Sequence, residues 1–207
     1  MSHLHFVSTE DHGRRVRQLG EAAGRVHVTG APGLDTLSDD EIADRNELEE
    51  FLKLPFESSP IVATYHPVTL EPCQSIAQIG EMLAVLENVD RPVVITYPNA
   101  DAEAGHIISE IRKFAESHSH AVAVPSLGLR RYRGLMQAAC AMIGNSSSGI
   151  IEAASFELPV VNIGNRQRGR TRGRNVIDVA ADRASIAYGL SKAESDAFRK
   201  SLAGMEN

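Results

Sequence analysis

Short apolar runs alternate along the chain with longer segments in which apolar residues recur every three or four positions. The runs are rich in β-branched residues and bounded by Gly, Pro, Asn or Ser, which is typical of buried strands. They predict strands at His5–Ser8, Val26–Thr29, Ile61–Tyr65, Val93–Tyr97, Ala121–Val124, Ala141–Ile143 and Val160–Ile163. Strands that alternate with helices predict an α/β fold: a Rossmann-like parallel sheet with helices on both faces.

The segments between these runs show helical periodicity. Apolar residues with the spacing of one helix face form two stripes: Ile76, Ile79, Leu83 and Leu86, and then Ile107, Ile111 and Phe114. Each stripe predicts a helix that packs against the sheet. Ser38 with Glu41 matches a capping box and predicts the start of a further helix, which runs through Leu48 and Leu52.

The composition is that of an ordinary globular protein. With 207 residues, of which 43% are hydrophobic and 23% charged, the chain is long enough for one sizeable core, or for one domain and a fragment of another. A formal net charge of -6 argues against a general affinity for nucleic acid, which requires a basic surface. Any anion site must therefore be local.

The cysteines and the apolar runs argue against several further classes of protein. Cys73 and Cys140 are far apart and lack the spacing of zinc ligands, so we expect two reduced, partly buried thiols and no metal site. The N-terminal residues lack the apolar region of a signal peptide, and no apolar run approaches the roughly 20 residues of a membrane span. We therefore expect a cytoplasmic protein.

Polar segments follow four of the predicted strands. They are GAPGLD at residues 30–35, His66-Pro67, PNAD at residues 98–101, and the serine-rich loop that begins after Ile143. Open α/β sheets bind ligands beyond the carboxyl ends of their strands, so we expect these segments to converge on one edge of the sheet. Gly30 and Gly33 of the first segment have a simpler interpretation as bends of the backbone.

The most informative stretch is AMIGNSSSGIIEAASFELPVVNIG, residues 141–164, which predicts a strand, an anion-binding loop, a helix and a strand. Ser146, Ser147 and Ser148 precede the predicted helix, so hydroxyls and backbone N–H groups are available to a phosphate. Glu152 follows one turn later, within reach of a ribose. The arrangement favours a nucleotide diphosphate, although the GxGxxG and GxxxxGK[ST] fingerprints are both missing. The alternative is that serine acts here only as an N-cap.

Three other candidates also have simpler interpretations. His66 could be a hydrogen-bonded histidine at a strand end, and Asn99 and Asp101 could only stabilise the turn that contains them. The run RQRGRTRGR, residues 166–174, is the one concentration of positive charge in an acidic chain. It is either a solvated loop or a flexible segment that closes over a diphosphate, with Arg166 nearest the ligand. An RNA-binding role is disfavoured because no aromatic residues are interleaved.

Four motifs together carry a family resemblance. TYHPVTLE, TYPNAD, GNSSSGIIEAASF and VVNIGNRQRGR, in this order and at these intervals, resemble the hydrolysing UDP-N-acetylglucosamine 2-epimerases, in particular the branch that acts in sialic and legionaminic acid biosynthesis. The resemblance extends from about Phe6 to Asp178 and matches the C-terminal half of the family. It implies a fold like the C-terminal domain of a glycosyltransferase-B type epimerase, in which two Rossmann-like domains face each other across a cleft.

The resemblance also implies a reaction. Family enzymes expel UDP by elimination across C1 and C2 of the sugar and then add water, which yields the 2-epimeric free sugar, without a cofactor or a metal ion. The substrate would be UDP-N-acetylglucosamine or a 2,4-diacetamido UDP-sugar, and the complete enzyme is compatible with a homodimer. A glycosyltransferase of the same architecture and a non-catalytic UDP-sugar binding module remain alternatives.

Site residues follow from the resemblance position by position. The UDP-binding residues that it implies are Asn99, Leu127, Ser146, Ser147, Glu152 and Arg166, and the candidate catalytic residue is His66. The two serines would hold the phosphates, and Arg166 would reach the UDP from the next loop. Leu127 would offer backbone groups to uracil, and Glu152 would bind the ribose hydroxyls.

In the family, the other half contributes the acidic residues and the arginine that handle proton transfer, so we expect activity only in a complete enzyme. We expect residues 1–24 to be the end of that half or an inter-domain segment, residues 25–184 to form the UDP-binding domain, and residues 185–207 to form C-terminal helices. A truncated gene product, a misplaced start or a deliberately shortened chain would account for the length.

Overall fold

The computed structural model describes residues 2–35, 42–68, 71, 74–101 and 103–207. The chain divides into two compact units, residues 1–41 and 42–207. The first unit contains a parallel β-α-β element made of β1 (His5–Val7), α1 (Glu10–Gln18) and β2 (Val26–Val28). The Thr9 side chain caps α1, because it accepts a hydrogen bond from the His12 N–H at 3.2 Å.

The second unit is built on a six-stranded sheet in the order β5-β4-β3-β6-β7-β8, and every neighbouring pair is parallel. Its strands are β3 (Ile61–Thr64), β4 (Val93–Thr96), β5 (Ala121–Val124), β6 (Ala141–Gly144), β7 (Val160–Ile163) and β8 (Val176–Val179). Counted within this unit, the order is 3-2-1-4-5-6, the doubly wound arrangement, which reverses between β3 and β6. The prediction of a Rossmann-like parallel sheet is confirmed.

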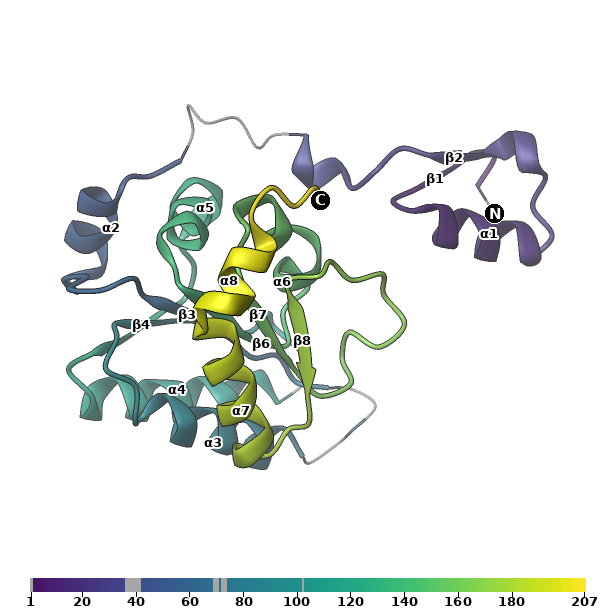
Figure 1. The fold of residues 1–207 in the computed structure, drawn as a ribbon. Coiled ribbons are helices and arrows are strands. Elements are labelled where there is room, and N and C mark those ends of the chain that lie inside the picture. Colours follow the sequence, from purple (N-terminus) through teal and green to yellow (C-terminus); the bar gives the residue numbers. More distant parts are fainter. Residues whose placement is uncertain (1, 36–41, 69–70, 72–73, 102) are drawn as a thin grey trace. The chain divides into compact units, whose positions relative to one another are not determined.

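Helices cover both faces of this sheet (Figure 1). One face carries α3 (Ser75–Leu86), α4 (Ala104–Ser117) and α7 (Arg183–Glu194), which α8 (Asp196–Leu202) follows. The other face carries α2 (Arg45–Leu52), α5 (Gly128–Ala138) and the short α6 (Ser148–Ile151). Each face has its own core because side chains alternate along the strands: Ile61 and Ala63 lie in one core and Val62 in the other.

The strands expected from the sequence are all present, with ends within one residue of their expected positions. β8 was not predicted. It lies at the edge of the sheet, and its short run contains Asp178, whose carboxylate pairs with the Arg172 guanidinium at 2.9 Å. A charged residue in a four-residue strand removes the continuous apolar signal on which the prediction depends.

Two helix predictions need adjustment. In α3, Ile76 belongs to the predicted buried stripe but is 49% exposed. Met82, which is not part of that stripe, is fully buried. Ser38 and Glu41, the predicted capping box, lie outside the described residues. The helix through Leu48 and Leu52 begins at Arg45, and the Asp44 side chain caps it by accepting a hydrogen bond from the Glu47 N–H at 2.9 Å.

The expected domain boundaries do not coincide with the compact units. β2, expected in the UDP-binding domain, pairs with β1 in the first unit. The GAPGLD segment follows β2 and so does not follow a strand of the six-stranded sheet, and the expectation that four segments converge on one sheet edge is wrong for this segment. The boundary expected between residues 184 and 185 falls inside α7.

Candidate functional site

β3 and β6 lie side by side where the strand order reverses. Gly144, the last residue of β6, has a φ of +130°, and a Cβ atom there would lie 1.9 Å from the Thr64 carbonyl oxygen. Glycine alone tolerates this combination of backbone angle and close approach. The chain after Thr64 and the chain after Gly144 therefore leave the sheet next to each other, at the edge where open α/β sheets bind ligands.

Asn145 joins these two chain segments. It is fully buried, its Oδ1 accepts a hydrogen bond from the His66 N–H at 2.7 Å, and its Nδ2 donates to the His66 carbonyl oxygen at 2.8 Å. Its backbone N–H donates to the Thr64 carbonyl oxygen at 3.1 Å. One amide side chain thus holds the loop that contains His66 against the serine-rich loop.

His66 lies in this junction as a neutral imidazole. The Asn99 N–H, from the segment after β4, donates to His66 Nδ1 at 3.3 Å, so the proton of the neutral ring is on Nε2. Burial lowers the pKa of His66 to about 4, and Arg166 adds to this effect while Asp101 opposes it. At neutral pH, His66 therefore offers an uncharged N–H donor.

Arg166 comes from the segment after β7. Its Nη1 donates to the Asn145 carbonyl oxygen at 3.1 Å, and Gln167 Nε2 donates to the same oxygen at 2.7 Å. Burial lowers the pKa of the half-buried Arg166, whereas nearby Asp101 acts in the opposite direction. Segments that follow β3, β4, β6 and β7 therefore meet around His66 and Asn145.

The helix after the serine-rich loop is short. α6 has four residues and passes into a 3-10 helix at Ala153–Phe156, so little helix dipole is available at its start. Ser147 caps α6 through its carbonyl oxygen, which accepts hydrogen bonds from the N–H groups of Ile150 and Ile151 at 3.0 and 2.9 Å. Its side chain makes no capping hydrogen bond, so the N-cap interpretation does not account for the Ser147 hydroxyl.

Tyr132, on α5, is a residue that the sequence analysis missed. Burial raises the pKa of its phenol, and the nearby side chains of Ser148, Thr64 and Ser146 oppose this shift. Ser146 Oγ accepts a hydrogen bond from the Ser148 N–H at 3.3 Å. Tyr132 thus brings α5 close to the serine-rich loop and to the end of β3.

Glu152 and Leu127 complete the set of predicted site residues. Glu152 is half-buried at the end of α6 and is close enough to Tyr132 to raise the pKa of its phenol. Leu127 is the N-cap of α5, and its side chain, only 5% exposed, belongs to the apolar core. Any contact of Leu127 with a ligand would therefore be made by its backbone groups.

A polar hollow of about 690 Å³ lies at the carboxyl ends of β7 and β8. Its lining includes Glu71, Gln78, Asn165, Arg168, Arg172 and Asp178. The Glu71 carboxylate accepts hydrogen bonds from Asn165 Nδ2 at 3.2 Å and from Gln78 Nε2 at 2.9 Å. Glu71 thus links the segment after β3 to the segment after β7.

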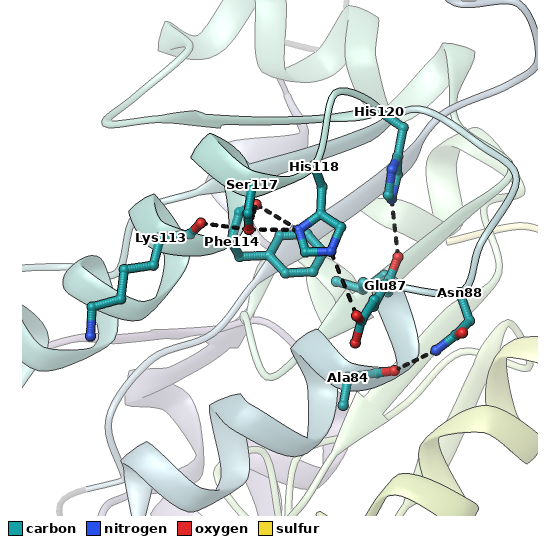
Figure 2. Close-up of polar contacts among 9 residues, drawn as sticks. Ala84, Glu87, Asn88, Lys113, Phe114, Ser117, His118 and His120 are labelled. Atoms are coloured by element: carbon teal, nitrogen blue, oxygen red, sulfur yellow. Dashed lines mark hydrogen bonds and ion pairs between the residues drawn. The ribbon is translucent and has the colours of Figure 1, made fainter.

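A separate histidine cluster lies at the opposite edge of the sheet. Figure 2 shows His118 and His120, which precede β5, grouped with Phe114 and with Glu87 at the end of α3. His118 Nδ1 donates to the Phe114 carbonyl oxygen at 2.8 Å, and His120 Nε2 donates to the Leu86 carbonyl oxygen at 3.2 Å. These bonds satisfy carbonyl groups at the ends of α4 and α3, which is a structural role.

Within the described part of the chain, no three His, Cys, Asp or Glu side chains are grouped so that they could hold a metal ion. The helices described there all lack the length and apolarity needed to cross a membrane. Cys73 lies outside the described residues, and Cys140 is a buried free thiol whose pKa is raised by burial.

The sequence is similar to known epimerases along its whole length. A family model described as UDP-N-acetylglucosamine 2-epimerase matches residues 1–207. A GDP/UDP-N,N'-diacetylbacillosamine 2-epimerase (hydrolyzing) of Campylobacter jejuni is 37% identical over 203 residues, which are 97% of this chain and 52% of that protein. The chain spans about half the length of the curated relatives it matches.

Solved structures share the fold. The S. aureus MnaA-UDP co-structure has a TM-score of 0.74 at 14% sequence identity, over 100% of this chain and 55% of that one. The UDP-GlcNAc 2-epimerase from Neisseria meningitidis bound to UDP-GlcNAc has a TM-score of 0.67 at 18% identity, over 100% of this chain and 56% of that one. The expected fold, that of the C-terminal domain of a glycosyltransferase-B type epimerase, is confirmed. Because the family model matches every residue, this chain belongs to the UDP-N-acetylglucosamine 2-epimerase family.

Proposed function

We propose that the chain is the UDP-binding half of a hydrolysing UDP-sugar 2-epimerase. The observation that carries this proposal is the meeting of His66, the serine-rich loop and Arg166 around Asn145, where the strand order of the sheet reverses. The two solved relatives contain UDP and UDP-GlcNAc, which supports the proposal. We assign UDP binding to the second unit, because it contains all of the proposed residues.

The diphosphate is assigned to the serine-rich loop and Arg166. The Ser147 hydroxyl is not used in capping α6, and Ser146 Oγ accepts a hydrogen bond from the Ser148 N–H at 3.3 Å within the same loop. Arg166 supplies positive charge within a chain whose formal net charge is -6. Hydrogen bonds between a guanidinium and a phosphate are roughly twice as strong as neutral ones, so Arg166 is expected to contribute most to affinity.

The nucleoside is assigned to the neighbouring residues. A carboxylate accepts hydrogen bonds through both oxygens, which suits Glu152 to the two hydroxyls of a ribose. Leu127 would contact uracil through its backbone groups, since its side chain is buried in the core. Asn99 would lie near the nucleotide, where its N–H already orients the His66 ring.

In the complete enzyme, elimination would break the bond between sugar C1 and the departing phosphate oxygen while a base removes the proton from C2. Water would then add across the resulting double bond. Arg166 and the uncharged His66 N–H would stabilise the negative charge that develops on UDP. A His66 pKa of about 4 favours a role as a hydrogen-bond donor over a role as a cation. The base is assigned to the half of the relatives that this chain does not span.

Two substrates fit the proposal. One is UDP-N-acetylglucosamine, and the other is a 2,4-diacetamido UDP-sugar, the class named in the C. jejuni relative. Either would give UDP and the 2-epimeric free sugar, for which the cytoplasm is the proposed location. Product analysis with both substrates, after the 207-residue chain is joined to the N-terminal half of a relative, separates the two.

Calorimetric titration of the 207-residue protein with UDP tests the binding step. We expect Ser147→Ala to weaken binding about tenfold and Arg166→Ala about 30-fold, which are typical costs of losing hydrogen bonds to charged groups. Ser109→Ala, at an exposed position on α4, and Arg174→Ala, in the same arginine-rich run, are the matched controls and should bind like the wild type. A folded wild-type protein that shows no saturable UDP binding would contradict the proposal.

A non-catalytic UDP-sugar module is the second candidate, because the residues assigned here bind the nucleotide and none of them is assigned as the base that removes the proton from C2. UDP binding without turnover, even in the joined protein, would favour that candidate. Release of UDP with a free 2-epimeric sugar would favour the epimerase, and a transferred glycosyl group would favour a glycosyltransferase.

A further inference from the structure

Asn145 uses all of its polar groups within the fold. Its side-chain amide pairs with both backbone groups of His66, and its own backbone N–H pairs with the Thr64 carbonyl oxygen. Its carbonyl oxygen accepts hydrogen bonds from Arg166 Nη1 and Gln167 Nε2. One fully buried residue therefore contacts the segments that follow β3 and β7 while it begins the segment that follows β6.

An amide is well matched to this position. Its donor and acceptor face the N–H and the C=O of the same residue, as a neighbouring strand would, although β3 ends at Thr64. A carboxylate could not donate to the His66 carbonyl oxygen, and an apolar side chain would leave both His66 groups without a partner. Buried polar groups without partners are costly, so the pairing fixes the position of His66.

We propose that Asn145 is a positioning residue for the diphosphate end of the ligand, a role that rests on the proposed function. It holds His66, the serine-rich loop and Arg166 in one arrangement before the ligand arrives. Preorganisation of this kind increases affinity because the ligand does not have to order the groups that bind it. The uridine end is assigned to Glu152 and Leu127, and within the part of the chain that the structure describes Asn145 makes no hydrogen bond to either residue.

A comparison of UDP binding with uridine binding distinguishes a positioning role of Asn145 from a general contribution to the stability of the fold. Asn145→Ala should weaken UDP binding about 30-fold and change uridine binding less than about twofold, because uridine lacks the phosphates. UDP is measured by calorimetry and uridine by NMR titration. A residue that merely stabilises the fold would weaken both ligands by the same factor or neither of them.

Asn175→Ala is the matched control. Asn175 is also fully buried, and its Nδ2 donates to the Leu158 carbonyl oxygen at 2.9 Å, at the amino end of β7 and β8. This variant should lose stability and keep the wild-type ratio of UDP affinity to uridine affinity. If Asn145→Ala also keeps that ratio, the positioning role is wrong. If the wild type fails to bind UDP, the proposed function is wrong and the role of Asn145 falls with it.

A measurement on the wild type keeps the proposal testable if Asn145→Ala does not fold. Hydrogen exchange of the His66 amide should already be slow without ligand, since the bond to Asn145 Oδ1 is formed before UDP binds. An amide that exchanges freely without UDP and becomes protected with it would overturn the proposal.

Discussion

His66 owes its neutral state to its burial between two loops. A histidine with a pKa of about 4 in the folded protein and about 6.5 in the unfolded chain binds fewer protons when folded between these pH values. The free energy of unfolding should therefore fall by about 3 kcal/mol as the pH falls from about 6.5 to 4. Urea titrations of the wild type and His66→Gln across this range test the prediction. Equal pH dependence of the two proteins would contradict it.

Glu152 provides a second test at the scale of a single residue. If its carboxylate binds the ribose hydroxyls, the wild type should prefer UDP to 2′-deoxy-UDP by about tenfold, the value of a hydrogen bond to a charged group. Glu152→Ala should bind the two nucleotides equally, and calorimetry with both measures this. Retention of the preference in Glu152→Ala would assign the ribose to other residues.

At the scale of elements, the packing of β6 against β3 depends on Gly144. Gly144→Ala would place a Cβ atom 1.9 Å from the Thr64 carbonyl oxygen at a φ of +130°, so we expect a loss of stability of about 3 kcal/mol or more. Gly80→Ala is the control, since Gly80 lies in α3 with no atom within 4 Å of the new Cβ. It should stabilise the protein by about 0.5–1 kcal/mol. Chemical denaturation measures both, and a Gly144→Ala protein as stable as the wild type would show that the strands can separate.

The strands could be predicted because most of them are continuous apolar runs, buried on both faces as in other parallel sheets. Periodicity did not reveal that β2 belongs to a different sheet, because local sequence does not identify the pairing partner of a strand. It also missed β8, where Asp178 interrupts an edge strand. The predicted helix after the serine-rich loop is present, but it is short, because the chain tightens into a 3-10 helix from Ala153.

Residues of the candidate site could be predicted from the sequence where they lie just after the end of a strand. His66 and Ser146 each come two residues after the end of a strand, β3 and β6 respectively. Because the carboxyl ends of parallel strands lie at one edge of the sheet, the sequence predicts that these residues lie close together. Tyr132 could not be found in this way. It lies within α5, and its approach to the serine-rich loop depends on how that helix packs against the sheet. The role of Asn145 was hidden for the same reason, since its partners are distant in the sequence.

At the scale of the whole molecule, residues 42–207 have their own sheet and two cores. A chain that begins at Ile42 should therefore fold by itself and bind UDP within about threefold of the affinity of the 207-residue protein. Circular dichroism on heating and calorimetry test this. Loss of cooperative unfolding in the shorter chain would mean that residues 1–41 are part of the same folding unit.

The location of UDP in a crystal of the complex tests the central claim most directly. We predict that the diphosphate lies at the carboxyl ends of β3 and β6, bonded to the Ser147 hydroxyl and the Arg166 guanidinium, with the ribose hydroxyls on Glu152. UDP bound elsewhere, for example in the polar hollow beside Arg168 and Arg172 at the ends of β7 and β8, would contradict the account.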